Sequence, residues 1–233
     1  MLGLFDPVYL LIVGPTMLLA IWAQMKVKGA YAKWSRIGNS SHLTGADAAE
    51  RMLRHAGVTN VRIEQTQGFL SDHYDPRTRT LRLSPNNYSG GSVAAVGIAC
   101  HEAGHALQHA NGYAPLALRN AIVPVASIGS WLAWPMIFIG IILHMAQLAT
   151  LGVIAFGALV VFQLITLPVE FDASRRAKQQ LGALGIVGSR EEGRGVAAVL
   201  DAAAMTYVAA TVTAVAQLLY FALRLGLLGG RDN

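Results

Sequence analysis

Residues 148–169 read LATLGVIAFGALVVFQLITLPV and contain no charged side chain. An α-helix needs about 20 predominantly apolar residues to cross the hydrocarbon core of a bilayer, so this stretch predicts a membrane-spanning helix. Three further apolar stretches approach that length, at about residues 7–24, 121–143 and 196–223, and none of the four has an internal Lys or Arg. The pattern predicts a mainly α, polytopic membrane protein with about four transmembrane helices.

The composition agrees with a membrane protein. Of the 233 residues, 54% are apolar and only 13% are charged, whereas soluble globular domains carry about 25% charged residues. The net charge of +5 does not indicate a nucleic-acid partner, because the basic residues follow apolar segments instead of forming a basic face. The single cysteine, Cys100, excludes an intramolecular disulfide, and we interpret it as a small buried residue, the alternatives being a nucleophile or a metal ligand.

The basic residues also predict the topology. Eleven of the 18 Lys and Arg residues lie between Met25 and Asn120, and five lie between Glu170 and Gly195. Since Lys and Arg concentrate on the cytoplasmic side, both polar segments are expected in the cytoplasm, with the two termini outside. No basic residue precedes the first apolar stretch, which favours an uncleaved anchor over a signal peptide.

The expected parts of the chain follow from this topology. The second and third apolar stretches are separated by a short loop and predict a helical hairpin, with Pro124, Pro135 and Pro168 kinking or ending the helices. The fourth stretch is rich in small residues and contains Asp201, so it either spans the membrane or packs against the protein. The parts are an N-terminal anchor (1–24), a cytoplasmic catalytic region (25–119), a transmembrane hairpin (120–169), a cytoplasmic segment (170–195), and a C-terminal transmembrane helix and tail (196–233).

The region between the first two apolar stretches has the pattern of a small α+β fold. Residues 47–55 have helical spacing, residues 61–64 and 80–83 alternate as strands do, and a further helix is expected over 93–110. We expect the strand at 80–83 to offer its edge to an extended peptide substrate.

That second helix carries the sequence His101-Glu102-Ala103-Gly104-His105, which matches H-E-x-x-H. The two histidines lie one helical turn apart on one face, where both can bind one Zn²⁺ ion. Glu102 lies beside them, where its carboxylate reaches a water at the metal as a general base. The motif also occurs by chance, but the small residues of this helix permit close packing by other helices, which favours a zinc site.

A catalytic zinc ion usually has three protein ligands. We expect Glu170 to be the third, because it directly follows the third apolar stretch on the cytoplasmic side; the alternative is a carboxylate paired with Arg175 or Arg176. His109 lies a further turn along the helix, about 6 Å away, so we expect it to support or cap the site instead of binding the metal.

The residues around the expected ligands are less well determined by spacing. Asp172 is a candidate for orienting a ligand histidine, and Asp201 is its rival for that role. For stabilising an oxyanion, the sequence favours Tyr207 and His73 over Tyr74 and Arg175.

Four stretches resemble the bacterial membrane neutral zinc metallopeptidase family, the YugP-like proteins, over essentially the whole chain. They are residues 72–76, 81–85, 99–110 and 170–174, and residues 206–210 in the last apolar stretch also look like that family. The resemblance implies a gluzincin-type site in the bacterial inner membrane, with His101, His105 and Glu170 as ligands and Glu102 as catalytic acid and base. The chain is more distantly similar to Ste24-type membrane peptidases, in which the segment with the third glutamate reads E-x-x-x-D. In this chain Ser174 stands in place of that Asp.

The sequence therefore predicts a zinc-dependent endopeptidase that cleaves membrane or membrane-proximal proteins at the cytoplasmic face. Its expected partners are the lipid bilayer and a protein or peptide substrate, and small-residue helix faces permit a homo-oligomer or another membrane protein. Two alternatives are a non-catalytic zinc-binding membrane scaffold and an intramembrane-cleaving protease. Glu102 favours catalysis over the scaffold, and the modest hydrophobicity of the motif helix favours cleavage at the membrane surface.

Overall fold

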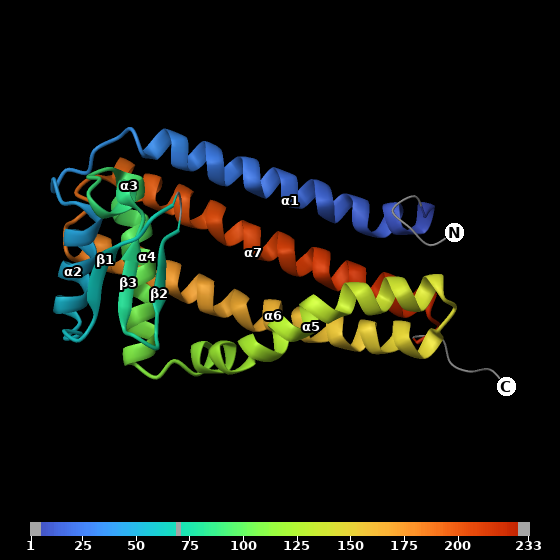
Figure 1. The fold of residues 1–233 in the computed structure, drawn as a ribbon. Helices are drawn as coiled ribbons and strands as arrows, with labels where there is room; N and C mark the ends of the chain where they lie inside the picture. Colours follow the sequence, from blue (N-terminus) through green and yellow to red (C-terminus); the bar gives the residue numbers. More distant parts are fainter. Residues whose placement is uncertain (1–5, 69–70, 228–233) are drawn as a thin grey trace. The chain divides into compact units, whose positions relative to one another are not determined.

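The computed structural model describes residues 6–68 and 71–227, which are mainly helical (Figure 1). Within these residues four helices are long and apolar enough to cross a membrane, and each contains all or nearly all of one predicted stretch. This finding confirms the mainly α fold with four candidate spans. Residues 1–5 of the expected anchor and residues 228–233 of the expected tail lie outside the described residues. The four helices are α1 (Pro7–Trp34), α5 (Ala114–Ile142), α6 (Ala146–Ala183) and α7 (Arg190–Arg224).

The prolines of the long helices do not end them. Pro124 and Pro135 lie inside α5, and Pro168 lies inside α6. Of the two alternatives expected for Pro168, a kink or a helix end, the structure excludes the end, because α6 continues for fifteen residues beyond it, to Ala183. A proline removes one backbone hydrogen bond, and the rest of a long helix tolerates that loss. As a result, one continuous helix carries both an apolar stretch and Glu170.

The chain divides into two compact units. The span unit comprises residues 1–23, 118–167 and 206–233, and the sheet unit comprises residues 24–117 and 168–205. In the span unit α5 and α6 form the predicted hairpin (Figure 1) and approach closely at small residues. A Cβ on Gly140 would lie only 2.4 Å from the amide nitrogen of Ala149.

An ionic contact joins two further helices of the span unit. Asp6, which precedes α1 and is buried, accepts a hydrogen bond of 2.8 Å from the hydroxyl of Tyr220 on α7 and also pairs with Arg224. The Asp6 carboxylate also accepts a 2.9 Å hydrogen bond from the backbone amide of Val8. A buried carboxylate needs such partners, so this contact ties the start of α1 to the end of α7.

The sheet unit contains the remaining helices and strands. The predicted helix at 47–55 begins slightly earlier, because Thr44 and Asp47 form a capping box at its N-terminus. The predicted helix at 93–110 has the same bounds in the structure and is capped by the Ser92 hydroxyl. The elements are α2 (Gly45–His55), β1 (Arg62–Gln65), β2 (His73–Asp75), β3 (Thr80–Leu83), α3 (Pro85–Tyr88) and α4 (Val93–Ala110).

The three strands form one sheet in the order β1-β3-β2. β1 pairs with β3 in parallel, and β2 pairs with β3 in antiparallel orientation, with Tyr74 opposite Leu81. The expectation that the strand at 80–83 offers its edge to a substrate is therefore wrong, because β3 is the central strand and both of its edges are paired. The edges of the sheet are β1 and β2.

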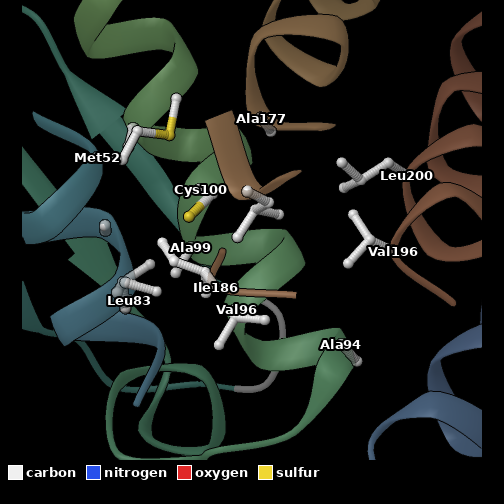
Figure 2. Packing of buried hydrophobic residues seen from close by; sticks show 14 of the residues in the cluster. Met52, Leu83, Ala94, Val96, Ala99, Cys100, Ala177, Ile186, Val196 and Leu200 are labelled. Carbon is white, nitrogen blue, oxygen red and sulfur yellow. The ribbon is translucent and has the colours of Figure 1, made fainter. Parts of the chain in front are cut away.

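The core of the sheet unit surrounds α4. The helix buries Val96, Ala99, Cys100 and Ala103 against residues from α2, β3 and the parts of α6 and α7 in this unit. Figure 2 shows Cys100 inside this cluster, among side chains that include Met52 and Ile186. The small residues of α4 let its neighbours approach closely, so the helix that carries the H-E-x-x-H motif is held on several sides.

Candidate metal centre

The two histidines of the motif project from one face of α4. His101 and His105 are one turn apart, and their ring centroids are 4.9 Å apart with the ring planes at 84°. His105 is buried and His101 is partly buried. The α4 helix therefore presents two imidazole groups to the same small volume, as the spacing predicts.

Glu170 of α6 lies against both histidines. Its Oε2 atom is 3.3 Å from Nε2 of His101 and 3.7 Å from Nε2 of His105, and the residue is only 3% exposed. One ligand atom from each of the three residues lies within 4.8 Å of the other two. The structure thus brings together the three residues that the sequence selects, all within the sheet unit.

A close approach of two backbones makes this grouping possible. A Cβ on Gly104 would lie 2.7 Å from the carbonyl oxygen of Ala173 and 3.2 Å from its Cα. Only glycine leaves room for α6 at this position of the motif, so the backbones of α4 and α6 touch between the ligand residues.

The other ring nitrogen of each histidine also has a polar neighbour. Nδ1 of His101 lies 3.1 Å from the hydroxyl of Ser174, and Nδ1 of His105 lies 3.0 Å from Oε1 of Gln108. Ser174 therefore occupies the position of the missing Asp and contacts a histidine directly. Gln108 was not among the expected site residues.

The two rival aspartates have different surroundings. Asp172 is buried and accepts a 2.9 Å hydrogen bond from Gln108, so it reaches His105 only through that amide. Asp201 is exposed and accepts a 2.7 Å hydrogen bond from Lys178. Of the two, Asp172 is connected to the candidate ligands.

Two opposing effects act on the pKa of His105. Burial lowers the pKa of His105, but the adjacent Glu170 and the nearby Glu102 outweigh burial, and the pKa lies above its ordinary value. Two carboxylates thus lie close to a buried imidazole, which is an arrangement that favours positive charge at this position.

Two residues near the motif do not belong to the group of ligand atoms. Nδ1 of His109 lies 2.9 Å from the hydroxyl of Tyr74, so this ring joins α4 to β2. Cys100 is fully buried, and burial raises the pKa of its thiol, which makes the thiol unreactive. The burial of Cys100 agrees with the expectation of a core residue, whereas a supporting role of His109 at the site stays a prediction.

The two expected oxyanion-stabilising residues are not part of this group either. His73 is exposed, and its Nδ1 lies 2.8 Å from the backbone oxygen of Ser71. Its neighbour Tyr74 faces α4, and alternate residues of a strand point to opposite faces, so His73 points away from α4. Tyr207 lies on α7 in the span unit. Both roles stay predictions.

Comparisons with known proteins found a matching family and a related sequence. Residues 9–226 match a family described as "Putative neutral zinc metallopeptidase". The chain is also 47% identical over 216 residues to "Putative membrane protease YugP" of Bacillus subtilis (strain 168), covering 92% of this chain and 94% of that relative. No solved structure matches the chain.

Proposed function

The chain belongs to the neutral zinc metallopeptidase family, and from this premise we propose that it is a membrane-embedded, zinc-dependent endopeptidase. It hydrolyses peptide bonds of membrane or membrane-proximal proteins at the cytoplasmic face. The observation that carries the proposal is the grouping of His101, His105 and Glu170 on two helices, with Glu102 next to the first histidine in the sequence.

The three side chains suit a zinc ion. Zinc bonds to imidazole nitrogen and carboxylate oxygen are about 2.0–2.2 Å long, so tetrahedral ligand atoms lie roughly 3.3–3.6 Å apart. The separations from Glu170 Oε2 to His101 Nε2 and His105 Nε2 are 3.3 and 3.7 Å. Two histidines and one glutamate also leave a fourth position for the reaction, as catalytic zinc sites do.

The proposed reaction depends on Glu102. A bound zinc ion supplies Lewis acidity, which polarises a peptide carbonyl and acidifies a water molecule. Glu102 accepts a proton from the attacking water and then donates it to the nitrogen of the leaving amine. It is partly buried, whereas Glu170 is almost fully buried between the histidines, so the two glutamates are suited to different roles.

The proposed place of cleavage follows from the helix that carries Glu170. The apolar stretch 148–169 ends directly before this residue on α6. Glu170 then belongs near the level at which α6 leaves the bilayer, and the Lys and Arg distribution favours the cytoplasmic side. Peptide bonds close to a transmembrane segment are therefore the proposed substrates.

The strand proposed to hold the substrate is β2 and not β3. β2 is an edge strand, and its residue Tyr74 contacts α4 through His109. An extended peptide can add to such an edge through backbone hydrogen bonds.

Two glutamate substitutions test the proposal. In Glu102→Gln, zinc bound by the purified protein should stay unchanged, while hydrolysis should fall by about 10²–10⁴-fold because the general base is lost. In Glu170→Gln, zinc content and hydrolysis should both fall. Glu191→Gln changes an exposed glutamate at the start of α7 and serves as the matched control.

The measurement compares membranes that contain wild-type or Glu102→Gln protein. New protein N-termini, identified by mass spectrometry, should appear with the wild type and be absent with the variant. Proteins that co-purify with Glu102→Gln should include the same substrates. Full hydrolysis by a Glu102→Gln protein that still binds zinc would contradict the mechanism, and zinc binding without any new termini would favour the scaffold.

A further inference from the structure

Gln108 connects the two helices of the candidate metal centre. It lies three residues after His105 on α4 and is fully buried. Its Oε1 atom is 3.0 Å from Nδ1 of His105, while its Nε2 atom is 2.8 Å from the backbone oxygen of Val169 and 2.9 Å from Oδ2 of Asp172. All the amide's polar atoms therefore have partners, as burial requires.

These partners determine which way the amide faces. The backbone oxygen of Val169 can only accept a hydrogen bond, and so can an ionised carboxylate. Both carboxylate oxygens of Asp172 already act as acceptors, because Oδ1 accepts a hydrogen bond from Arg175 and Oδ2 accepts one from Arg176. The NH₂ group of Gln108 must then face these two acceptors. In the opposite orientation the amide oxygen of Gln108 would face two other oxygen atoms, and no hydrogen bond could form.

The fixed amide in turn constrains the imidazole. With Oε1 of Gln108 facing it, Nδ1 of His105 forms a hydrogen bond only when it carries a proton. We propose that Gln108, held by Asp172, is a positioning residue that keeps His105 in the Nδ1-protonated tautomer and so leaves Nε2 free to bind a metal. The inference rests on the metal binding of the proposed function.

The other histidine lacks this constraint. A hydroxyl both donates and accepts hydrogen bonds, so Ser174 is compatible with either neutral tautomer of His101. The centre is therefore asymmetric. The tautomer of His105 is fixed by Gln108 and Asp172, whereas His101 can adopt either neutral tautomer.

A test is to reverse the direction of the hydrogen bond between residues 108 and 172. In Gln108→Glu, a carboxylate oxygen can accept a hydrogen bond from His105 only if the other oxygen faces the carboxylate of Asp172 and the oxygen of Val169. Repulsion from these two acceptors should displace the side chain, so that His105 loses its partner. Adding Asp172→Asn supplies an amide that donates to the new carboxylate. The second substitution should therefore rescue the first, which a purely structural role does not predict.

The experiment measures zinc dissociation constants of the full-length protein in detergent, by competition with a chelator. Gln108→Glu should weaken zinc binding by about 10–100-fold, the usual cost of losing a partner of a ligand histidine. Asp172→Asn alone should have a smaller effect, and the double variant should bind zinc more tightly than Gln108→Glu. The control Gln179→Glu makes the same change at an exposed position of α6 and should bind zinc as the wild type does.

Two results would overturn the inference while leaving the proposed function intact. One is wild-type zinc affinity in Gln108→Glu, and the other is a double variant no better than Gln108→Glu. Failure of the wild type to bind zinc would instead count against the proposed function itself.

A measurement on the wild type covers the case in which the variants do not fold. In zinc-free protein labelled with ¹⁵N-histidine, at a pH where the rings are neutral, the ligand rings are identified as those whose signals shift when zinc is added. At least one of them should carry its proton on Nδ1. Finding both with the proton on Nε2 would overturn the inference.

Discussion

Gly104 of α4 lies so close to Ala173 of α6 that a Cβ on the glycine would come within 2.7 Å of the alanine carbonyl oxygen. Separations this short do not occur between a real Cβ and a backbone oxygen, so an added methyl group must displace a helix. The contact lies between the residues that carry the histidines and the segment that carries Glu170. The geometry of the metal centre thus depends on a glycine at position 104, where alanine would add a methyl group.

The substitution Gly104→Ala should therefore weaken both the fold and the centre. Overpacking of a buried contact usually costs about 1–3 kcal/mol, and here it also moves Glu170 away from the histidines. We expect a lower midpoint of thermal unfolding in detergent and a weaker zinc affinity, measured by chelator competition.

Gly97→Ala on the same helix is the matched control. A Cβ there would meet Val196 at 3.5 Å, an ordinary contact distance, and alanine favours a helix over glycine by up to about 1 kcal/mol. This variant should be as stable as the wild type or more so, with unchanged zinc affinity. If Gly104→Ala behaved in the same way, the close approach would not be needed for the centre.

Ser174→Ala should weaken zinc binding less than the change at Gln108. The hydroxyl of Ser174 is 3.1 Å from Nδ1 of His101, and its loss leaves that nitrogen without this contact. A neutral hydrogen bond contributes about 1 kcal/mol, so we expect a decrease in zinc affinity of about fivefold.

Ser89→Ala, an exposed change at the end of α3, is the control for this measurement. Should Ser174→Ala bind zinc as tightly as the control, the hydroxyl would not support the imidazole in place of the Asp of E-x-x-x-D.

Much of this architecture could be predicted because its signals are local. Four apolar stretches identified the four long helices, and the spacing of His101 and His105 identified one face of α4. The choice of Glu170 came from its position after an apolar stretch, and the structure places it with the histidines.

The errors concern relations between distant segments. The sequence alone did not show that β2 pairs with β3, because a strand of three residues has too little alternation to detect. The possibility that Pro168 ends its helix is likewise excluded, because α6 continues through it.

Gln108 was missed for a different reason. Its spacing of three residues from His105 places both on one face of α4, which is a signal in the sequence. Only the structure shows that Val169 and Asp172 complete the contacts of its amide. Pairs of residues spaced i,i+3 are common in helices. The role of the pair His105 and Gln108 depends on the hydrogen-bond partners that α6 supplies.

His109 should be dispensable for metal binding, although it is the third histidine of α4. Its Nδ1 contacts the Tyr74 hydroxyl at 2.9 Å, so His109→Gln should alter the contact with β2 and leave the zinc affinity unchanged. His105→Gln should reduce zinc affinity by more than the roughly 100-fold that loss of a supporting contact costs. Equal losses in the two variants, measured by chelator competition, would make His109 a ligand.

The topology can be tested by cysteine labelling, because we expect the thiol of Cys100 not to react. Cys100 is fully buried with a raised pKa, so a membrane-impermeant maleimide should not label the wild type. Arg77→Cys places an exposed thiol in the turn between β2 and β3, and Gln147→Cys places one at the start of α6. The distribution of Lys and Arg predicts that these two positions lie on opposite sides of the membrane.

We therefore expect the maleimide to label Gln147→Cys in intact spheroplasts and Arg77→Cys only in inverted membrane vesicles. The wild type controls for reaction at Cys100, and labelling after solubilisation in detergent controls for the accessibility of each new thiol. Labelling of Arg77→Cys in intact spheroplasts would place the sheet, and with it the metal centre, outside the cytoplasm. The proposed substrates would then be segments on the outer side of the membrane, although the chemistry of the centre would be unchanged.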